Sequence, residues 1–145
     1  ATGYLDTDYA AKGRAAIEEL KSSDLVCVHI EAPDEAGHEG NAAAKVKALE
    51  EIDEKIVAPV MTYLESTAAD GEPYRVLVCP DHPTFCSTQM HSRGQVPFLI
   101  AGEGVKASAA TSYNEAAALA GPTVLTGSSL IGHLFQEGLG DDLGE

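Results

Sequence analysis

The sequence predicts an α/β fold with a mainly parallel sheet, and three observations favour this class. Short apolar runs rich in β-branched residues, at residues 25–30, 74–79 and 96–101, are typical of strands that are covered on both faces. Segments with apolar residues three and four positions apart alternate with these runs, as in chains whose strands are joined by right-handed helical crossovers. The 44% apolar and 22% charged content of the 145 residues suits a packed domain.

The first predicted helix covers residues 8–21, because Thr7 and the acidic residue after it form a capping signal ahead of an apolar stripe. The apolar run at 25–30 then predicts the first strand. Residues 31–40 are polar and contain Pro33 and two glycines, so we expect a loop there. The stripe of the first helix consists of Tyr9, Ala10, Gly13, Ile17 and Leu20.

A long helix is predicted over residues 46–64, where apolar residues recur at spacings of three or four. Glu51 and Lys55 are four residues apart on another face of this helix, which favours an ion pair. Pro59 lies inside the pattern and predicts a bend. The apolar positions are Val46, Leu49, Ile52, Ile56, Val60 and Leu64.

The rest of the chain continues the alternation of strands and helices. An acidic, glycine-rich tail ends it and is expected to fray. No repeat and no linker-like change in composition interrupts the sequence, so residues 1–145 are predicted to form one domain. The predicted elements are a strand at 74–79, a polar loop at 80–95, a strand at 96–101, a short helix at 114–119 and a last helix at 128–137.

The net charge of −14 and the isoelectric point near 4.5 exclude nucleic acid as an expected partner, because the nine cationic side chains are dispersed along the sequence. No apolar stretch approaches the roughly 20 residues that a membrane span needs. The N-terminus lacks the basic and apolar regions of a signal peptide, so we expect a soluble, unexported protein.

The cysteines Cys27, Cys79 and Cys86 are odd in number and show no CxxC spacing, and two of them lie in apolar runs. They are therefore predicted to be reduced thiols that pack like small hydrophobic residues, which fits the cytoplasm. The chain starts at Ala1 with a segment, ATGYLDT, that predicts neither a helix start nor a strand. It is expected to be the end of something longer.

Four of the five histidines gather in two segments, each beginning at the end of a predicted strand. These segments read HIEAPDEAGHEGN and PDHPTFCSTQMHS, and the second lies in a loop too long for a tight connection. In an open parallel sheet, the loops beyond the carboxyl ends of the strands face a common crevice. The sequence therefore predicts one functional site built from both segments.

The residue types in these segments predict a metal site. Asp34 and His38 are four residues apart, so one helical turn places both on the same face. Asp81 and His82 are adjacent at a strand end, and His91 follows nine residues after His82, far enough for the loop to fold back. Carboxylate and imidazole ligands suit Zn, Mn, Fe or Co. Five such ligands are enough for two ions, each incompletely coordinated by this chain.

Other polar residues nearby are predicted to play different parts. His29 lies in an apolar strand and is expected to be a core histidine or to support a ligand rather than to bind a metal. His133 on the last helix is expected at the surface, and Cys86 is expected to be a packed thiol. Glu31 and Glu35 are either acceptors for the N–H groups of ligand imidazoles or solvated carboxylates.

Both segments resemble a known family. HIEAPDEAGHEGN with Lys45 and Asp53, PDHPT with His91, VPFLI, and the opening GYLDTDYAAKG are similar to the archaeal type of cofactor-independent (2,3-bisphosphoglycerate-independent) phosphoglycerate mutases, within the alkaline phosphatase superfamily. The similarity covers residues 3–100 and continues more weakly to Gly138. It implies an alkaline-phosphatase-like three-layer α/β/α fold, of which this chain is the C-terminal portion.

The resemblance also implies two divalent metal ions, which could be Mn, Zn, Mg or Co. By position, Asp34, His38 and His91 match the ligands of one ion, and Asp81 and His82 match two ligands of the other. The family's remaining ligands, an aspartate and the nucleophilic serine, and its substrate-binding arginines belong to an N-terminal part with no counterpart here. The resemblance therefore implies no catalytic nucleophile in this chain, with that missing part as its partner.

The function implied by the resemblance is that of a glycolytic isomerase. It interconverts 3-phosphoglycerate and 2-phosphoglycerate through a phosphoserine and needs no 2,3-bisphosphoglycerate, and this chain alone is expected to be inactive. Two alternatives stay open: another metal-dependent phosphotransferase or phosphatase of the alkaline phosphatase superfamily, or a noncatalytic metal-binding module. Homoserine kinase is a further function considered for such sequences, but the nucleotide-binding motif GxxxxGK[ST] is absent from the sequence.

Overall fold

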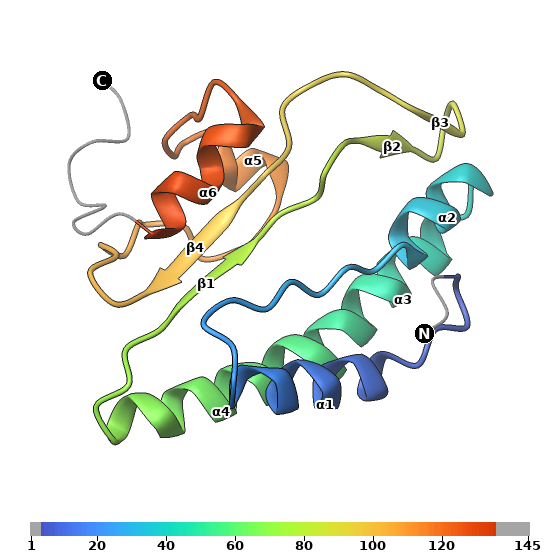
Figure 1. Cartoon of the computed structure of the whole chain (residues 1–145). Coiled ribbons are helices and arrows are strands. Elements are labelled where there is room, and N and C mark those ends of the chain that lie inside the picture. The colour runs from blue at the N-terminus through green and yellow to red at the C-terminus, as the bar shows by residue number, and fades with distance from the viewer. Residues whose placement is uncertain (1–3, 136–145) are drawn as a thin grey trace. The chain divides into compact units, whose positions relative to one another are not determined.

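The structure is a computed structural model that describes residues 4–135, and it divides into two compact units. The first unit contains residues 1–71 and 84–92, and the second contains residues 72–83 and 93–145. Figure 1 shows that helices dominate the first unit. The predicted tail and the end of the last predicted helix lie outside the described residues. The prediction of one domain over residues 1–145 stays a prediction.

Helix α1 (Tyr9–Leu20) begins the described part of the first unit and confirms the helix predicted there. Its N-cap is Asp8 rather than Thr7, because the Asp8 carboxylate accepts the backbone N–H of Ala11 at 2.8 Å. Thr7 is instead buried, with 5% of its surface exposed.

The long predicted helix is present as α3 (Ala42–Ile52), a π-helical turn η1 (Asp53–Val57) and α4 (Ala58–Ala69). The N–H of Ala58 bonds to the carbonyl of Asp53, five residues earlier. Pro59 has no N–H, and its ring would clash with the carbonyl four residues before it, so a wider turn relieves the conflict. The π-helical turn thus lies where the sequence predicts a bend.

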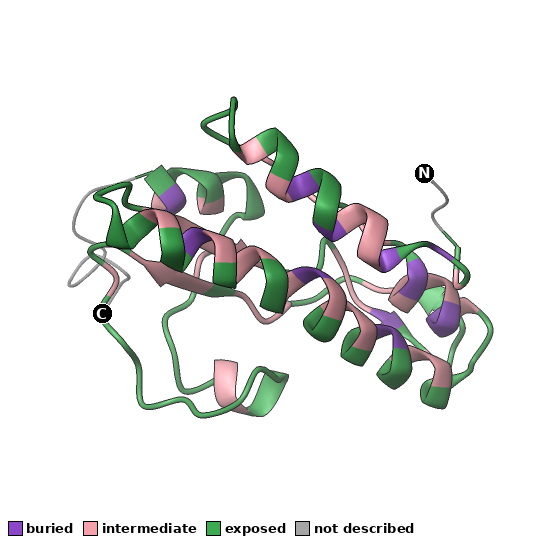
Figure 2. Cartoon of the chain, turned by 90° about the horizontal axis from the view of Figure 1, so that it is seen from below, coloured by how far each residue is buried: buried purple, intermediate pink, exposed green. Residues whose placement is uncertain are grey.

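Helix α1 packs against η1 and α4 in the first unit, and the buried residues recur along one side of these helices (Figure 2). Ile56 and Leu64 of the predicted stripe are buried, and Lys55 pairs with Glu51 as predicted. Val46 and Leu49 are 56% and 51% exposed, so the first part of the stripe is wrong. Ala48 takes the buried position there instead. The core cluster is Tyr9, Ala32, Ala48 and Ile56.

Two predictions between α1 and α3 are wrong. Residues 25–30 are extended but form no strand within the described part of the chain, because an apolar run sets an extended backbone without supplying a partner edge. Residues 31–40 are not a loop, since they contain helix α2 (Ala32–His38). Pro33 lies in the first turn of α2, where its missing N–H has no intrahelical partner to lose, so the proline starts a helix.

The second unit contains strands β1 (Arg75–Val78) and β4 (Leu99–Gly102), which pair antiparallel with Val78 opposite Leu99. The α/β class and the positions of both strands are confirmed, whereas the parallel pairing is wrong for these strands. An apolar run reports burial and carries no information on strand direction. Helix α5 (Glu115–Ala118) and helix α6 (Gly127–Phe135) follow as predicted.

The predicted loop at 80–95 contains a small hairpin of strands β2 (Thr84–Phe85) and β3 (Met90–His91). These strands pair antiparallel, with Thr84 opposite His91, and they belong to the first unit. Gln89 precedes β3 with a φ of 57°, in the left-handed region. The hairpin therefore returns the chain toward α2.

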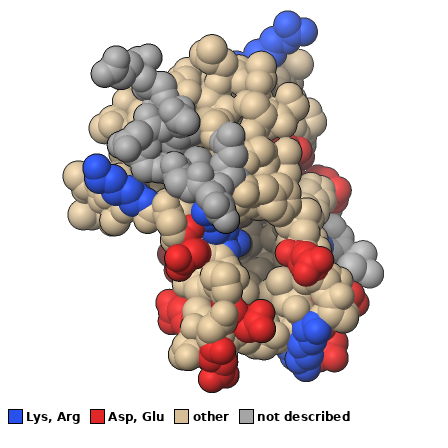
Figure 3. All heavy atoms as spheres, turned by 60° about the vertical axis from the view of Figure 1, so that its left-hand side comes forward, with Lys and Arg blue, Asp and Glu red and all other residues tan. Residues whose placement is uncertain are grey.

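The surface bears on the predicted partners and compartment. Figure 3 shows several separate acidic side chains on the face that it draws. Within residues 4–135, no helix is both long and apolar enough to cross a membrane.

The three cysteines are free thiols, but Cys27 and Cys79 are exposed, so their predicted burial is wrong. Around Cys27, the exposed residues Leu25 and His29 alternate with half-buried residues, so Cys27 lies on the exposed side of its segment.

Candidate metal centre

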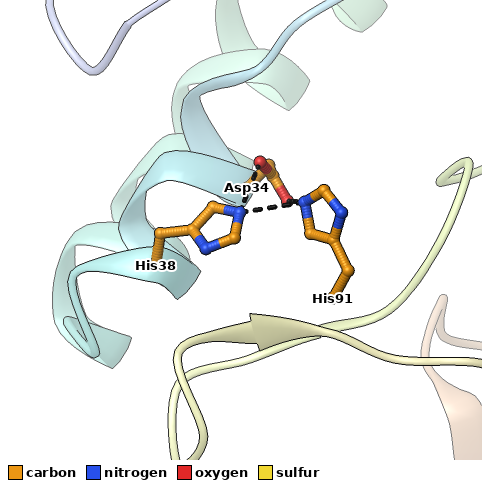
Figure 4. Close-up of side chains that lie close together, drawn as sticks. All are labelled: Asp34, His38 and His91. Atoms are coloured by element: carbon orange, nitrogen blue, oxygen red, sulfur yellow. Dashed lines mark hydrogen bonds and ion pairs between the residues drawn. The ribbon is translucent and has the colours of Figure 1, made fainter.

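Asp34, His38 and His91 converge in the first unit (Figure 4). Asp34 and His38 lie one turn apart on α2, and His91 projects toward them from β3. The Nε2 atom of His38 lies 3.3 Å from Asp34 Oδ2, and the Nε2 atom of His91 lies 3.3 Å from Asp34 Oδ1. The two Nε2 atoms are 2.9 Å apart. The sequence-predicted convergence of these three residues is therefore present.

These separations fit a common divalent ion. Ligand atoms about 2.1 Å from one ion lie about 3.4 Å apart in tetrahedral geometry and about 3.0 Å apart in octahedral geometry. The 2.9 Å between the two imidazole nitrogens falls in this range, and so does the 3.3 Å from each nitrogen to a different oxygen of Asp34. One ligand atom from each residue lies within 4.8 Å of the others. The set of one carboxylate and two imidazoles matches the donors that zinc and manganese accept. The residues present therefore fit a metal ion.

The environment of Asp34 keeps its carboxylate available as a ligand. Burial by itself would raise the pKa of Asp34, but the hydrogen bond from the Thr84 hydroxyl and the two nearby imidazoles outweigh it, so the pKa is lowered. Asp34 is consequently ionised at neutral pH. The side chains of His38 and His91 are 37% and 55% exposed, which leaves one side of the centre open to water or a substrate oxygen.

The tautomer of His38 follows from a neighbouring carbonyl. Its Nδ1 atom lies 2.9 Å from the backbone oxygen of Gln89, and a carbonyl can only accept, so Nδ1–H donates. A neutral ring then has its lone pair on Nε2, the atom that faces Asp34 and His91. Gln89 was not found by sequence reasoning, because a backbone acceptor leaves no residue-type signal.

Asp81 and His82 belong to the second unit and come just after β1. The Asp81 carboxylate accepts the N–H of His82 at 3.0 Å, and its Oδ2 lies 3.3 Å from His82 Nε2. The Asp81 side chain is 72% exposed. Within residues 4–135, these two belong to no group of three potential metal ligands. Their assignment as ligands stays a prediction.

The other candidates differ from expectation in several places. His29 is exposed, so it is not a core histidine, because the extended segment turns it outward. His133 is half-buried rather than at the surface. Cys86 is half-buried, in line with a packed thiol. Glu31 is exposed and Glu35 half-buried, while the N–H of His38 goes to a carbonyl instead of a carboxylate.

The aspartate–histidine–histidine cluster gives this α/β chain the donor set of a metal-binding protein. Residues 2–130 match the model of the Metalloenzyme superfamily, and the chain belongs to this family. Members of this superfamily use divalent metal ions, which agrees with the candidate centre.

Individual relatives carry a more specific name. A 2,3-bisphosphoglycerate-independent phosphoglycerate mutase of Methanosarcina mazei is 57% identical over 100 residues, covering 69% of this chain and 24% of the relative. One of Methanosarcina barkeri is 47% identical over 138 residues, covering 94% and 34%. The solved structure of protein PH0037 from Pyrococcus horikoshii has 31% identity and a TM-score of 0.74, covering 83% of this chain and 34% of that one.

These relatives confirm the resemblance to cofactor-independent phosphoglycerate mutases. The chain spans only about a quarter to a third of their length. These relatives therefore contain far more sequence than this chain.

Proposed function

We propose that this chain is the C-terminal metal-binding part of a phosphoglycerate mutase that interconverts 3-phosphoglycerate and 2-phosphoglycerate through a phosphoserine. The convergence of Asp34, His38 and His91 carries the proposal, because it supplies three ligands in metal-binding geometry within a chain whose relatives bear this name. The free cysteines suit the cytoplasm as its compartment.

The residues of the centre have distinct tasks in this proposal. Asp34 offers a charged oxygen, while His38 and His91 offer imidazole nitrogens and leave an open side for a phosphoryl oxygen. A bound divalent ion supplies charge neutralisation for phosphoryl oxygens and lowers the pKa of an attacking hydroxyl. Because the chain carries a net charge of −14, a bound cation also reduces the local repulsion between the centre and a phosphorylated substrate.

The activity is tested on the longer protein that contains this sequence. We expect it to convert 3-phosphoglycerate to 2-phosphoglycerate. We expect Asp34→Asn to lower kcat/KM by at least about a hundredfold, because losing a metal ligand costs more than losing a group that supports a ligand. His29→Ala is the matched control, because its ring is exposed outside the cluster. The 145-residue chain alone is expected to be inactive, because it brings no positioned nucleophile.

The outcomes separate the competing functions. Hydrolysis of phosphate esters without mutase activity would establish a phosphatase instead. Metal binding without either activity would establish a noncatalytic module. Turnover by the pure 145-residue chain, abolished by Asp81→Asn, would show that the nucleophile lies within this sequence.

We further propose that Asp81 and His82 belong to a second ion, which could be Mn, Zn, Mg or Co like the first. Two protein ligands hold such an ion weakly against water. At micromolar manganese, crystals of this chain should therefore show one anomalous peak, at Asp34, His38 and His91, and none at Asp81. Full occupancy at Asp81 and His82 would mean that this chain or a second copy completes the site, and it would remove the need for ligands from elsewhere.

A further inference from the structure

Thr84 is a buried polar residue at the base of the candidate metal centre, with 5% of its surface exposed. Its hydroxyl donates a hydrogen bond to Oδ1 of Asp34. A buried hydroxyl needs such a partner, and a carboxylate is a strong acceptor. The Thr84 hydroxyl therefore bonds to Asp34 rather than to water.

Thr84 is also paired with the ligand on the other segment. In the hairpin register it lies directly opposite His91, across the β2–β3 ladder. The residue thus contacts one ligand through its side chain and faces a second ligand through its backbone. Asp34 and His91 are 57 positions apart in sequence, and Thr84 connects the elements that carry them.

Two neighbours hold Thr84 in this position. Lys45 of α3 donates from Nζ to the Thr84 carbonyl at 2.6 Å. Gly37 of α2 lies so close that a Cβ there would be 2.9 Å from both Cγ2 and the carbonyl oxygen of Thr84. The absence of a side chain at Gly37 therefore permits the hairpin to approach the helix. The sequence alone assigns no role to this contact.

We propose that Thr84 is a positioning residue of the metal centre, which fixes the rotation of the Asp34 carboxylate and the distance of the His91 strand from α2. The hydroxyl occupies a lone pair of Oδ1 and restricts how the carboxylate can turn. A centre assembled from two separate segments loses less conformational freedom on binding an ion when its ligands are already held in place. This inference rests on the proposed metal site.

The test compares Thr84→Val with Thr84→Ser in zinc titrations of the folded chain by calorimetry. Valine keeps the shape and removes the donor, so zinc affinity is expected to fall about 10- to 100-fold. Serine keeps the donor and is expected to restore affinity to within about threefold of the parent. Unfolding measured with EDTA present separates loss of stability from loss of affinity.

A second variant covers the case in which Thr84→Val does not fold. Lys45→Met leaves the hydroxyl and all three ligands in place and removes the charged donor to the Thr84 carbonyl. It is expected to weaken zinc binding severalfold, and parent affinity in this variant would overturn the proposal.

Thr84→Val with parent affinity, or Thr84→Ser as weak as Thr84→Val, would equally overturn it. If His38→Ala weakens zinc binding and Thr84→Val does not, only the role of Thr84 fails. If His38→Ala has no effect, the metal centre itself fails, and the role of Thr84 fails with it.

Discussion

Replacing His38 with alanine is expected to lower the affinity of the chain for zinc or manganese by at least about a hundredfold, more than the loss of an outer support. The centre offers three protein ligands, with Nε2 of His38 3.3 Å from Asp34 Oδ2 and 2.9 Å from His91 Nε2. Removing one leaves a two-ligand site, which competes poorly with water. Calorimetric titration of the metal-free protein measures the change.

His29→Ala is the control for this experiment, since it removes a histidine of the same unit that lies outside the cluster. Its affinity should equal that of the parent. His38→Ala is not expected to unfold the protein, because the ring is 37% exposed. Unchanged binding after His38→Ala, with the fold intact by circular dichroism, would show that the ion binds elsewhere.

The residues of the candidate site could be predicted from the sequence, but the elements that bring them together could be predicted only in part. The spacing of Asp34 and His38 places them on one face of a helical turn, and this holds in α2 although a loop was expected there. The loop that carries His91 folds back as predicted, but the way in which it does so could not be predicted. It depends on a hairpin that turns at Gln89 with a φ of 57°, and a non-glycine residue gives no sequence signal for that conformation.

For the fold too, local features could be predicted from the sequence and long-range features could not. Helix α1 and the long helix of α3, η1 and α4 follow from amphipathic periodicity, which is a local property of the chain. Helix α2 has no such pattern and was expected to be a loop. The pairing of β1 with β4 is a long-range property, so the strands were found without their direction. Much of the packing of the first unit uses small residues such as Ala32 and Ala48, which contribute little to a hydrophobic pattern. Val46 and Leu49 were therefore assigned to the core and are exposed.

Gly13 of α1 is a second position with a large expected effect. A Cβ built there would lie 2.4 Å from the carbonyl oxygen of Lys55 and 3.3 Å from Cα of Ile56. Both atoms belong to the backbone of η1, so no side chain can rotate away and the helices must separate. Gly13→Ala is therefore expected to lower the free energy of unfolding by about 2 to 3 kcal/mol, a large part of the 5–15 kcal/mol typical of a domain. Thermal unfolding followed by circular dichroism measures it.

Gly132→Ala in α6 is the matched substitution, because nothing lies within 4 Å of a Cβ at that position. In an uncrowded helix, alanine is favoured over glycine by about 1 kcal/mol, so this variant should be as stable as the parent or more stable. The same chemical change is thus expected to have opposite signs in two helices, and packing is the only difference between them. If Gly13→Ala were stabilising as well, α1 and η1 could not be in contact at the distance described, and the close packing of the core around Ile56 would be wrong.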